Sequence, residues 1–219
     1  DLPEQQIHDV AIGGLVHDIG KSLVPQNVLN KPDRLNQQEF AQMRDHVTFS
    51  RQLLQGLPGI SQAALDVALL HHERMDGTGY PLGKDGASIS LIGRMSAIVD
   101  VYDALTSVRV YKNAWEPTLA MKKLVEWSPD HFDDVLVQRF VRCIGIYPVG
   151  ATVALESGRV GIVIDQGEKL IEPVVRIVYN GKHKHYERPV DLELSRTETD
   201  RVVSAVDPRQ YGLDPTQFI

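Results

Sequence analysis

Histidine and aspartate residues recur through the first half of the chain at positions that could together hold metal ions. Each lies at the end of a predicted apolar helix or on an inward-facing turn of such a helix. They are His17-Asp18, His46, His71-His72, Asp100 and Asp103. Imidazole and carboxylate groups without thiolate are the ligand set of manganese, iron or zinc hydrolytic centres. Two metals about 4 Å apart can activate water and clamp a phosphate. The pattern therefore favours a metal-dependent hydrolytic centre assembled from several helices.

The residues alone also allow a plainer interpretation. A lone histidine on a helix is commonly a packed or surface residue, and His8, His131, His183 and His185 are assigned to that group. The grouped residues are harder to explain by packing, because buried charges need partners. On the pattern alone, a metal site and a structural role both stay open.

Apolar residues at helical spacing predict the elements that would position these groups. The expected helices cover 7–19, 36–54, 60–72, 91–107, 118–127 and 133–143. Asn36 and Glu39 predict a capping box at the start of the second helix, and Gly20 is expected as the C-terminal cap of the first. One apolar stripe of the fourth helix is expected to face inward: Leu91, Met95, Ile98, Val99, Tyr102 and Leu105.

The residue pattern changes after Tyr147 from helical spacing to short strand-like runs. Short β-branched or aromatic runs cover 153–155, 159–164, 174–179 and 185–188, separated by glycine, asparagine and charged turns. They predict a small antiparallel barrel or meander over about 150–195, followed by a polar tail. We therefore expect a mainly α-helical domain over 1–147 and a small β appendage with its tail over 148–219.

Composition limits the class of protein. The 219 residues have a net charge of −6, which argues against a nucleic-acid polymer as partner, although a small anionic ligand needs only a local cluster of positive charge. No apolar run is long enough for a membrane helix, and no charged-then-apolar leader opens the chain. The single cysteine, Cys143, excludes an internal disulfide and fits a reducing compartment, so we expect a cytoplasmic location. The polar start without methionine suggests a piece of a longer protein.

Several motifs follow one another in the order and spacing of a known family. They are His17-Asp18-Ile19-Gly20-Lys21, Lys31-Pro32, the run His71-His72-Glu73-Arg74-Met75-Asp76-Gly77-Thr78-Gly79-Tyr80-Pro81, Asp100-Val101-Tyr102-Asp103-Ala104-Leu105-Thr106-Ser107, and the following Arg109, Tyr111 and Lys112. Over about residues 7–146 the chain resembles the HD-GYP family of the HD superfamily. The resemblance implies an HD-type helical bundle carrying a small C-terminal antiparallel β extension.

The resemblance also assigns roles by position. It implies metal ligation by a set of six residues: His17, Asp18, His46, His71, His72 and Asp100. It places Asp103 and Asp76 behind the ligands, orienting them or water. It assigns phosphate contacts to Lys21, Arg109 and Lys112, whose fixed charge suits developing negative charge on phosphoryl oxygens. His17, Asp18 and Lys21 would be the catalytic residues. Tyr80 could stack on a guanine base or anchor its loop on the helical bundle.

The implied activity is metal-dependent hydrolysis of a cyclic dinucleotide, with cyclic di-GMP expected, to the linear dinucleotide and then to GMP. Two alternatives stay open: a phosphodiesterase for 3′,3′-cyclic GMP-AMP, and a catalytically silent sensor or scaffold that binds the nucleotide or a GGDEF cyclase domain. The family suggests two or more divalent ions, iron or manganese in preference to magnesium or zinc. Diguanylate cyclase domains docking at the turn 77–81, and a homodimer, are further expectations. The match departs from the family pattern mainly because the family's upstream ligand helix has no counterpart before His17, and in smaller ways at Met75, Val108 and Val110.

Overall fold

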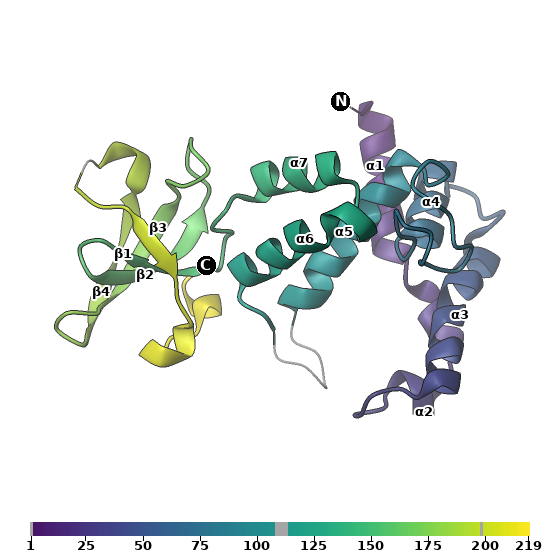
Figure 1. Cartoon of the computed structure of the whole chain (residues 1–219), viewed down its shortest axis with the longest axis horizontal. Coiled ribbons are helices and arrows are strands. Elements are labelled where there is room, and N and C mark those ends of the chain that lie inside the picture. Colours follow the sequence, from purple (N-terminus) through teal and green to yellow (C-terminus); the bar gives the residue numbers. More distant parts are fainter. Residues whose placement is uncertain (1, 108–113, 198) are drawn as a thin grey trace. The chain divides into compact units, whose positions relative to one another are not determined.

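The structure, a computed structural model, describes residues 2–107, 114–197 and 199–219. The chain divides into two compact units, the first formed by Asp1–Ala114 with Glu126–Val137 and the second by Trp115–Val125 with Gln138–Ile219. The first unit is helical, and the second carries an antiparallel sheet (Figure 1). The expectation of a mainly helical chain with a small C-terminal antiparallel β part is thus confirmed.

The helices follow one another along the first two thirds of the chain (Figure 1). They are α1 (Glu4–Val16), the 3-10 helix η1 (Ile19–Leu23), α2 (Gln26–Leu29), α3 (Gln37–Leu54), α4 (Gln62–Leu70), α5 (Leu91–Thr106), α6 (Pro117–His131) and α7 (Asp134–Ile144). Helices α6 and α7 each contribute residues to both units.

Local side-chain caps start the helices that carry the site. The Asn36 side chain accepts from the Glu39 amide while the Glu39 carboxylate accepts from the Asn36 amide, so the predicted capping box is confirmed. Ser61 caps α4 by accepting from the Ala64 amide, and Ser90 caps α5 by accepting from the Gly93 amide. These caps hold the helix starts by bonds that are encoded locally.

Helix α1 ends earlier than its sequence pattern suggests. It stops at Val16, and Gly20 lies inside η1, buried against α3, where a methyl group would clash with the His46 carbonyl. The expected role of Gly20 as a helix cap is therefore wrong, because the residue is needed for the close approach of two backbones. Gly13 serves the packing of α1 on α4 in the same way, since an added Cβ would lie 2.8 Å from the Val67 Cβ.

The buried stripe of α5 is narrower than predicted. Ile98 and Leu105 are buried, whereas Leu91 and Val99 are 44% and 52% exposed. The expectation was wrong for these two residues. Val99 follows Ile98 by about 100° around the helix, so the two side chains face different directions. Leu91 is the first residue of the helix.

The second unit is built on a five-stranded antiparallel sheet in the order β4-β3-β2-β1-β5. Its strands are β1 (Thr152–Leu155), β2 (Arg159–Asp165), β3 (Val174–Asn180), β4 (His185–Glu193) and β5 (Val202–Ala205), and short 3-10 helices cover Leu194–Arg196, Pro208–Tyr211 and Pro215–Gln217. The first four strands form the predicted meander. One sheet face packs a core around Val153, Val163 and Val175.

Strand β5 falls in the stretch that was expected to be a polar tail, and that expectation was wrong. The strand forms because its residues pair with β1, as in the register of Val153 with Ala205. Such a pairing bridges about fifty residues of sequence, and a local alternation pattern over four residues does not reveal it.

Candidate metal centre

Four α-helices and the 3-10 helix η1 bring the predicted ligand residues to one place. His17 is the C-cap of α1 and Asp18 starts η1. His46 lies within α3, His71 is the C-cap of α4 with His72 directly after it, and Asp100 lies on α5. All six residues are buried or half-buried. The structure therefore gathers every side chain of the predicted ligand set.

One hydroxyl fixes the backbone on both sides of Asp18. The Ser50 Oγ on α3 accepts from the Gly20 amide at 2.9 Å and donates to the His17 carbonyl at 2.8 Å. Ser50 is fully buried, so water cannot replace these bonds easily. The turn that carries His17 and Asp18 is thereby joined to the helix that carries His46.

The orientation of three imidazoles is set by carbonyl groups of their own helices. Nδ1 of His17 lies 2.7 Å from the Gly14 carbonyl, Nδ1 of His46 lies 2.6 Å from that of Met43, and Nδ1 of His71 lies 3.0 Å from that of Val67. A carbonyl oxygen can only accept, so each Nδ1 carries the proton in the neutral ring. The Nε2 lone pair of each ring is left for another partner, as in metal-binding histidines.

These Nε2 atoms converge on the Asp18 carboxylate. Asp18 Oδ1 lies 3.3 Å from Nε2 of His46 and 3.9 Å from Nε2 of His71, and Asp18 Oδ2 lies 3.3 Å from Nε2 of His17. Two groups of three residues each bring their ligand atoms within 4.8 Å of one another. One group is His46, His71 and His72, and the other is His17, Asp18 and His71. His71 belongs to both groups but has one free lone pair and can bind one ion, whereas the two oxygens of the Asp18 carboxylate could bridge two neighbouring ions.

A second carboxylate faces the first across the histidines. Asp100 Oδ2 lies 3.6 Å from Nδ1 of His72, and Asp100 Oδ1 lies 3.8 Å from Nε2 of His17. The cluster thus contains four imidazoles and two carboxylates, which is a nitrogen and oxygen donor set suited to manganese, iron or zinc.

Three buried atoms of the cluster lack any hydrogen-bond partner. They are Asp18 Oδ1, His46 Nε2 and His71 Nε2. An unpaired buried polar atom costs about 1–3 kcal/mol, and three that converge on one spot need a common partner. A cation bound there would accept all three lone pairs, so the residues fit a metal ion.

The cluster keeps its donors in the forms that bind metal. Burial lowers the pKa of His71 to about 4 and that of His72 to about 2. Burial alone would raise the pKa of Asp18, but contacts with His17, His46 and Lys21 hold it well below its usual range. Both imidazoles are therefore neutral and the carboxylate ionised at neutral pH.

Metal binding is expected to weaken first through His17. The neighbouring Asp18 carboxylate raises the pKa of His17 above its usual 6.5, against the effect of burial. Since a proton and a metal compete for the Nε2 lone pair, affinity should fall by about tenfold per pH unit once the pH drops below this raised pKa. His71 and His72, with lowered pKa values, stay neutral over that range.

Calorimetric titration with Mn²⁺ between pH 5.5 and 8.5 measures this effect. A His17→Gln variant should bind more weakly, and its loss of affinity should begin at a lower pH than in the parent protein. An onset at the same pH in both proteins would contradict the assignment to His17.

The remaining predicted site residues lie at different distances from the cluster. The Lys21 ammonium forms an ion pair with Asp18. Asp103 is exposed on α5 and accepts from the Ser107 hydroxyl at 3.2 Å. Asp76 is exposed and accepts from the Thr78 amide and hydroxyl within its own turn. Arg109 and Lys112 lie outside the described residues.

Tyr80 packs directly on the cluster. Its ring centroid lies 4.6 Å from that of His72 with an interplanar angle of 32°, and the Arg44 guanidinium lies 4.4 Å from the Tyr80 centroid. Burial and the Asp100 carboxylate raise the pKa of the Tyr80 hydroxyl, which therefore stays protonated. Tyr80 covers one side of the cluster with an aromatic ring that already has neighbours.

Glu73 is a residue whose role the sequence did not reveal. It is 2% exposed, and its two carboxylate oxygens accept from the amides of Leu82 and Lys84 at 2.7 and 2.9 Å. The Gly79 backbone packs so closely on Glu73 that a Cβ would clash. Glu73 thus clamps the loop that carries Tyr80. Its place directly after His71-His72 was the one signal available.

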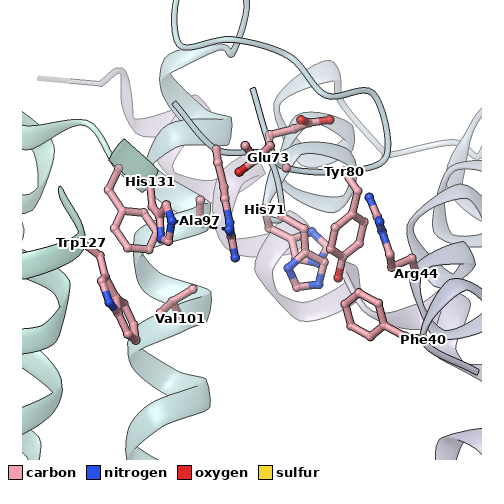
Figure 2. A pocket seen from close by; sticks show the side chains of 14 residues that line it. Phe40, Arg44, His71, Glu73, Tyr80, Ala97, Val101, Trp127 and His131 are labelled. Atoms are coloured by element: carbon pink, nitrogen blue, oxygen red, sulfur yellow. Dashed lines mark hydrogen bonds between the residues drawn. The ribbon is translucent and has the colours of Figure 1, made fainter. Parts of the chain in front are cut away.

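The cluster opens into a cavity of about 350 Å³. His71 and His72 form part of its wall, and Tyr80, Arg44 and Phe40 line one side of it (Figure 2). Trp127 and His131 line the other side, from the part of α6 that belongs to the first unit (Figure 2). No pattern in the sequence predicted that His131 or Trp127 would line the same cavity as the histidine cluster. A cavity of this size can hold a small-molecule ligand next to the imidazoles.

The HD domain family model matches residues 1–136, the part of the chain that contains the whole His and Asp cluster. The chain belongs to the HD domain family. A cyclic di-GMP phosphodiesterase of Pseudomonas aeruginosa is 43% identical over 205 residues, which are 93% of this chain and 49% of that protein. A 3′3′-cGAMP-specific phosphodiesterase of Vibrio cholerae is 36% identical over 138 residues, which are 63% of this chain and 26% of that protein.

A solved structure shares the fold of this domain. An HDG"Y"P protein from Bdellovibrio bacteriovorus superposes with a TM-score of 0.50 at 20% identity, covering 62% of this chain and 42% of that one. The expected resemblance to HD-GYP proteins is confirmed. The chain spans about half the length of its relative from Pseudomonas aeruginosa and about a quarter of that from Vibrio cholerae. Within the described part of the chain, no helix combines the length and apolarity that crossing a membrane requires.

Proposed function

We propose that this HD domain is a metal-dependent phosphodiesterase that hydrolyses a cyclic dinucleotide, with cyclic di-GMP as the expected substrate. The observation that carries the proposal is the group of unpartnered buried atoms, Asp18 Oδ1, His46 Nε2 and His71 Nε2, next to the cavity. The name of the relative from Pseudomonas aeruginosa supports the choice of substrate.

The two oxygens of the Asp18 carboxylate would divide the ligands into two groups. One ion would be held by His17 with Asp18 Oδ2, and the other by His46, His71 and His72 with Asp18 Oδ1. Asp100 lies near His17 and His72 and would serve either ion. Bound ions would lower the pKa of water and offset negative charge on the phosphate, and the donor set favours iron or manganese over magnesium.

The chain's own residues supply orientation and charge. The carbonyls of Gly14, Met43 and Val67 hold the rings so that Nε2 faces the ligand site. Lys21, fixed beside Asp18, would place a positive charge next to a non-bridging phosphoryl oxygen, where negative charge grows in the transition state. We assign the same task to Arg109 and Lys112 on the strength of the family pattern. Asp103 and Asp76 are assigned to the orientation of ligands or water.

Turnover and metal content should be measured on the same sample of the whole chain. The protein is loaded with Fe²⁺ or Mn²⁺ without oxygen, its metal is counted by mass spectrometry, and cyclic di-GMP, 3′,3′-cyclic GMP-AMP and cyclic di-AMP are offered in parallel. Lys21→Met should lower kcat about a hundredfold while two ions stay bound, because one electrostatic contact to the transition state is lost. Lys122→Met, on the exposed face of α6, is the matched control.

The outcomes separate the remaining alternatives. A preference for the mixed dinucleotide would assign the chain to the activity named for the Vibrio cholerae relative. Two bound ions and a tightly bound nucleotide without turnover would favour a silent sensor and overturn the proposal. Docking of diguanylate cyclase domains at the turn 77–81 and a homodimer stay predictions.

A further inference from the structure

The cavity continues past the histidines into a corner that the hydrolytic centre does not use. Its walls are Arg74 from the loop after α4, Trp127 and His131 from α6, and the following Phe132. In Figure 2, Trp127 and His131 lie on the opposite side of His71 from Tyr80. A substrate whose phosphate reaches the histidines would extend a base to one of these two sides.

The corner is held in place by bonds on both of its elements. The Met75 amide donates to the His131 carbonyl at 3.1 Å, which joins the loop after His72 to the end of α6. An ion pair of 2.6 Å between Arg94 and Asp133 fixes the residues that follow. Phe132 is buried behind the corner. The rings are therefore positioned before any ligand arrives, which lowers the cost of binding.

The arrangement of the aromatic rings leaves the Trp127 side of the cavity open to a ligand. On the other side of the cavity, the Tyr80 ring already has two neighbours. Its centroid lies 4.6 Å from that of the His72 ring and 4.4 Å from the Arg44 guanidinium. The Trp127 and His131 centroids are 6.3 Å apart and their ring planes are inclined by 39°, so the two rings do not lie flat on each other. The indole face is therefore available for a flat aromatic ligand, and purines stack on such faces.

Arg74 supplies a polar group at the edge of this surface. Its side chain is exposed, its Nη1 lies 3.5 Å from Nε2 of His131, and it forms no ion pair among the described residues. A guanidinium with free N–H groups presents a planar fork of donors. The fork matches the O6 and N7 acceptors of guanine, whereas adenine presents an N6 donor at the position of O6.

We propose that Trp127, His131 and Arg74 form a guanine-binding subsite, in which the indole stacks on the base and the guanidinium reads its O6 and N7 edge. The inference rests on the proposed function, since it places the scissile phosphate at the histidine cluster. It predicts that the chain selects dinucleotides by the presence of guanine, so that cyclic di-AMP is rejected and 3′,3′-cyclic GMP-AMP binds in one orientation.

Fluorescence of Trp127 tests the subsite without relying on turnover. The chain has two tryptophans, so Trp115→Phe leaves Trp127 as the single indole. The metal-loaded Trp115→Phe protein is titrated with the hydrolysis-resistant bisphosphorothioate analogues of cyclic di-GMP and cyclic di-AMP. The guanine analogue should quench the indole and bind at least about tenfold more tightly than the adenine analogue.

Arg74→Lys in the same background keeps the charge but removes the fork. It should weaken binding of the guanine analogue about tenfold and leave the adenine analogue almost unchanged. In turnover of cyclic di-GMP it should raise KM about tenfold with kcat within threefold of the parent. Arg51→Lys, at an exposed arginine on α3, is the control and should change neither quantity.

Failure of the subsite can be told apart from failure of the enzyme. If the parent turns over cyclic di-GMP but Arg74→Lys changes neither quenching nor KM, the subsite is wrong and the phosphodiesterase stands. If nothing is hydrolysed but the guanine analogue still quenches Trp127 in an Arg74-dependent way, the subsite stands and the enzymatic proposal fails. Equal affinity for the two analogues in the parent protein would overturn the subsite in either case.

Discussion

Replacing Asp18 with asparagine should lower turnover of cyclic di-GMP by at least about a thousandfold, equivalent to about 4 kcal/mol of transition-state stabilisation. The carboxylate of Asp18 lies within 3.9 Å of Nε2 of His17, His46 and His71. Asparagine has nearly the same shape but lacks the charge that a cation needs beside neutral imidazoles. Its amide group would also present N–H donors toward those lone pairs or toward Lys21.

Metal content decides how this loss arises. We expect Asp18→Asn to lose the ion that His17 holds together with the carboxylate, while the group of His46, His71 and His72 keeps part of its affinity for the other ion. Mass spectrometry and turnover should be measured on one preparation. Asp66→Asn is a matched control on α4, where the carboxylate accepts from the Gln62 amide. Full metal content with turnover within tenfold of the parent would contradict the assignment.

Replacing Glu73 with glutamine should destabilise the first unit by about 3 kcal/mol. The Glu73 carboxylate accepts two buried backbone amides, those of Leu82 and Lys84. A glutamine can accept only one of them and turns an N–H₂ group toward the other, and hydrogen bonds to a buried charged group contribute about 1.5–3 kcal/mol each. Urea unfolding of the metal-free protein measures the loss.

Hydrogen exchange locates the effect of Glu73→Gln. The amides of Leu82 and Lys84 should exchange faster even below the unfolding transition, because they lose their acceptors. KM should rise, since the same loop carries Tyr80 and Arg74 to the cavity. Glu4→Gln in the exposed first turn of α1 is the control. Unchanged exchange at both amides would show that the loop is held by other contacts.

Local signals in the sequence predicted the start of α3 and the ligand set. The capping box of Asn36 and Glu39 involves residues three apart, so a short window of sequence contains both partners. The candidate ligands could be grouped because several imidazole and carboxylate side chains recur at the ends or inward-facing turns of apolar helices. The family resemblance then assigned metal ligation to six of the grouped residues and placed Asp103 behind them.

Features that depend on distant partners could not be predicted in the same way. Trp127 and His131 reach the cavity because the end of α6 bonds to Met75, more than fifty residues earlier in the chain. Glu73 finds its amides across a loop whose path only the folded chain defines. The exposure of Val99 likewise follows from which faces of α5 have neighbours. Composition and periodicity contain none of this information.

The bonds from the imidazoles to their own helices have a consequence for metal supply. Because Gly14, Met43 and Val67 orient the three rings, the donors do not depend on an ion for their direction. Departure of an ion would leave a cluster that is unsatisfied but still shaped to bind another. The proposed centre would therefore exchange its occupant at the rate at which ions dissociate, without local refolding. Its composition would then follow the iron and manganese available in the cell.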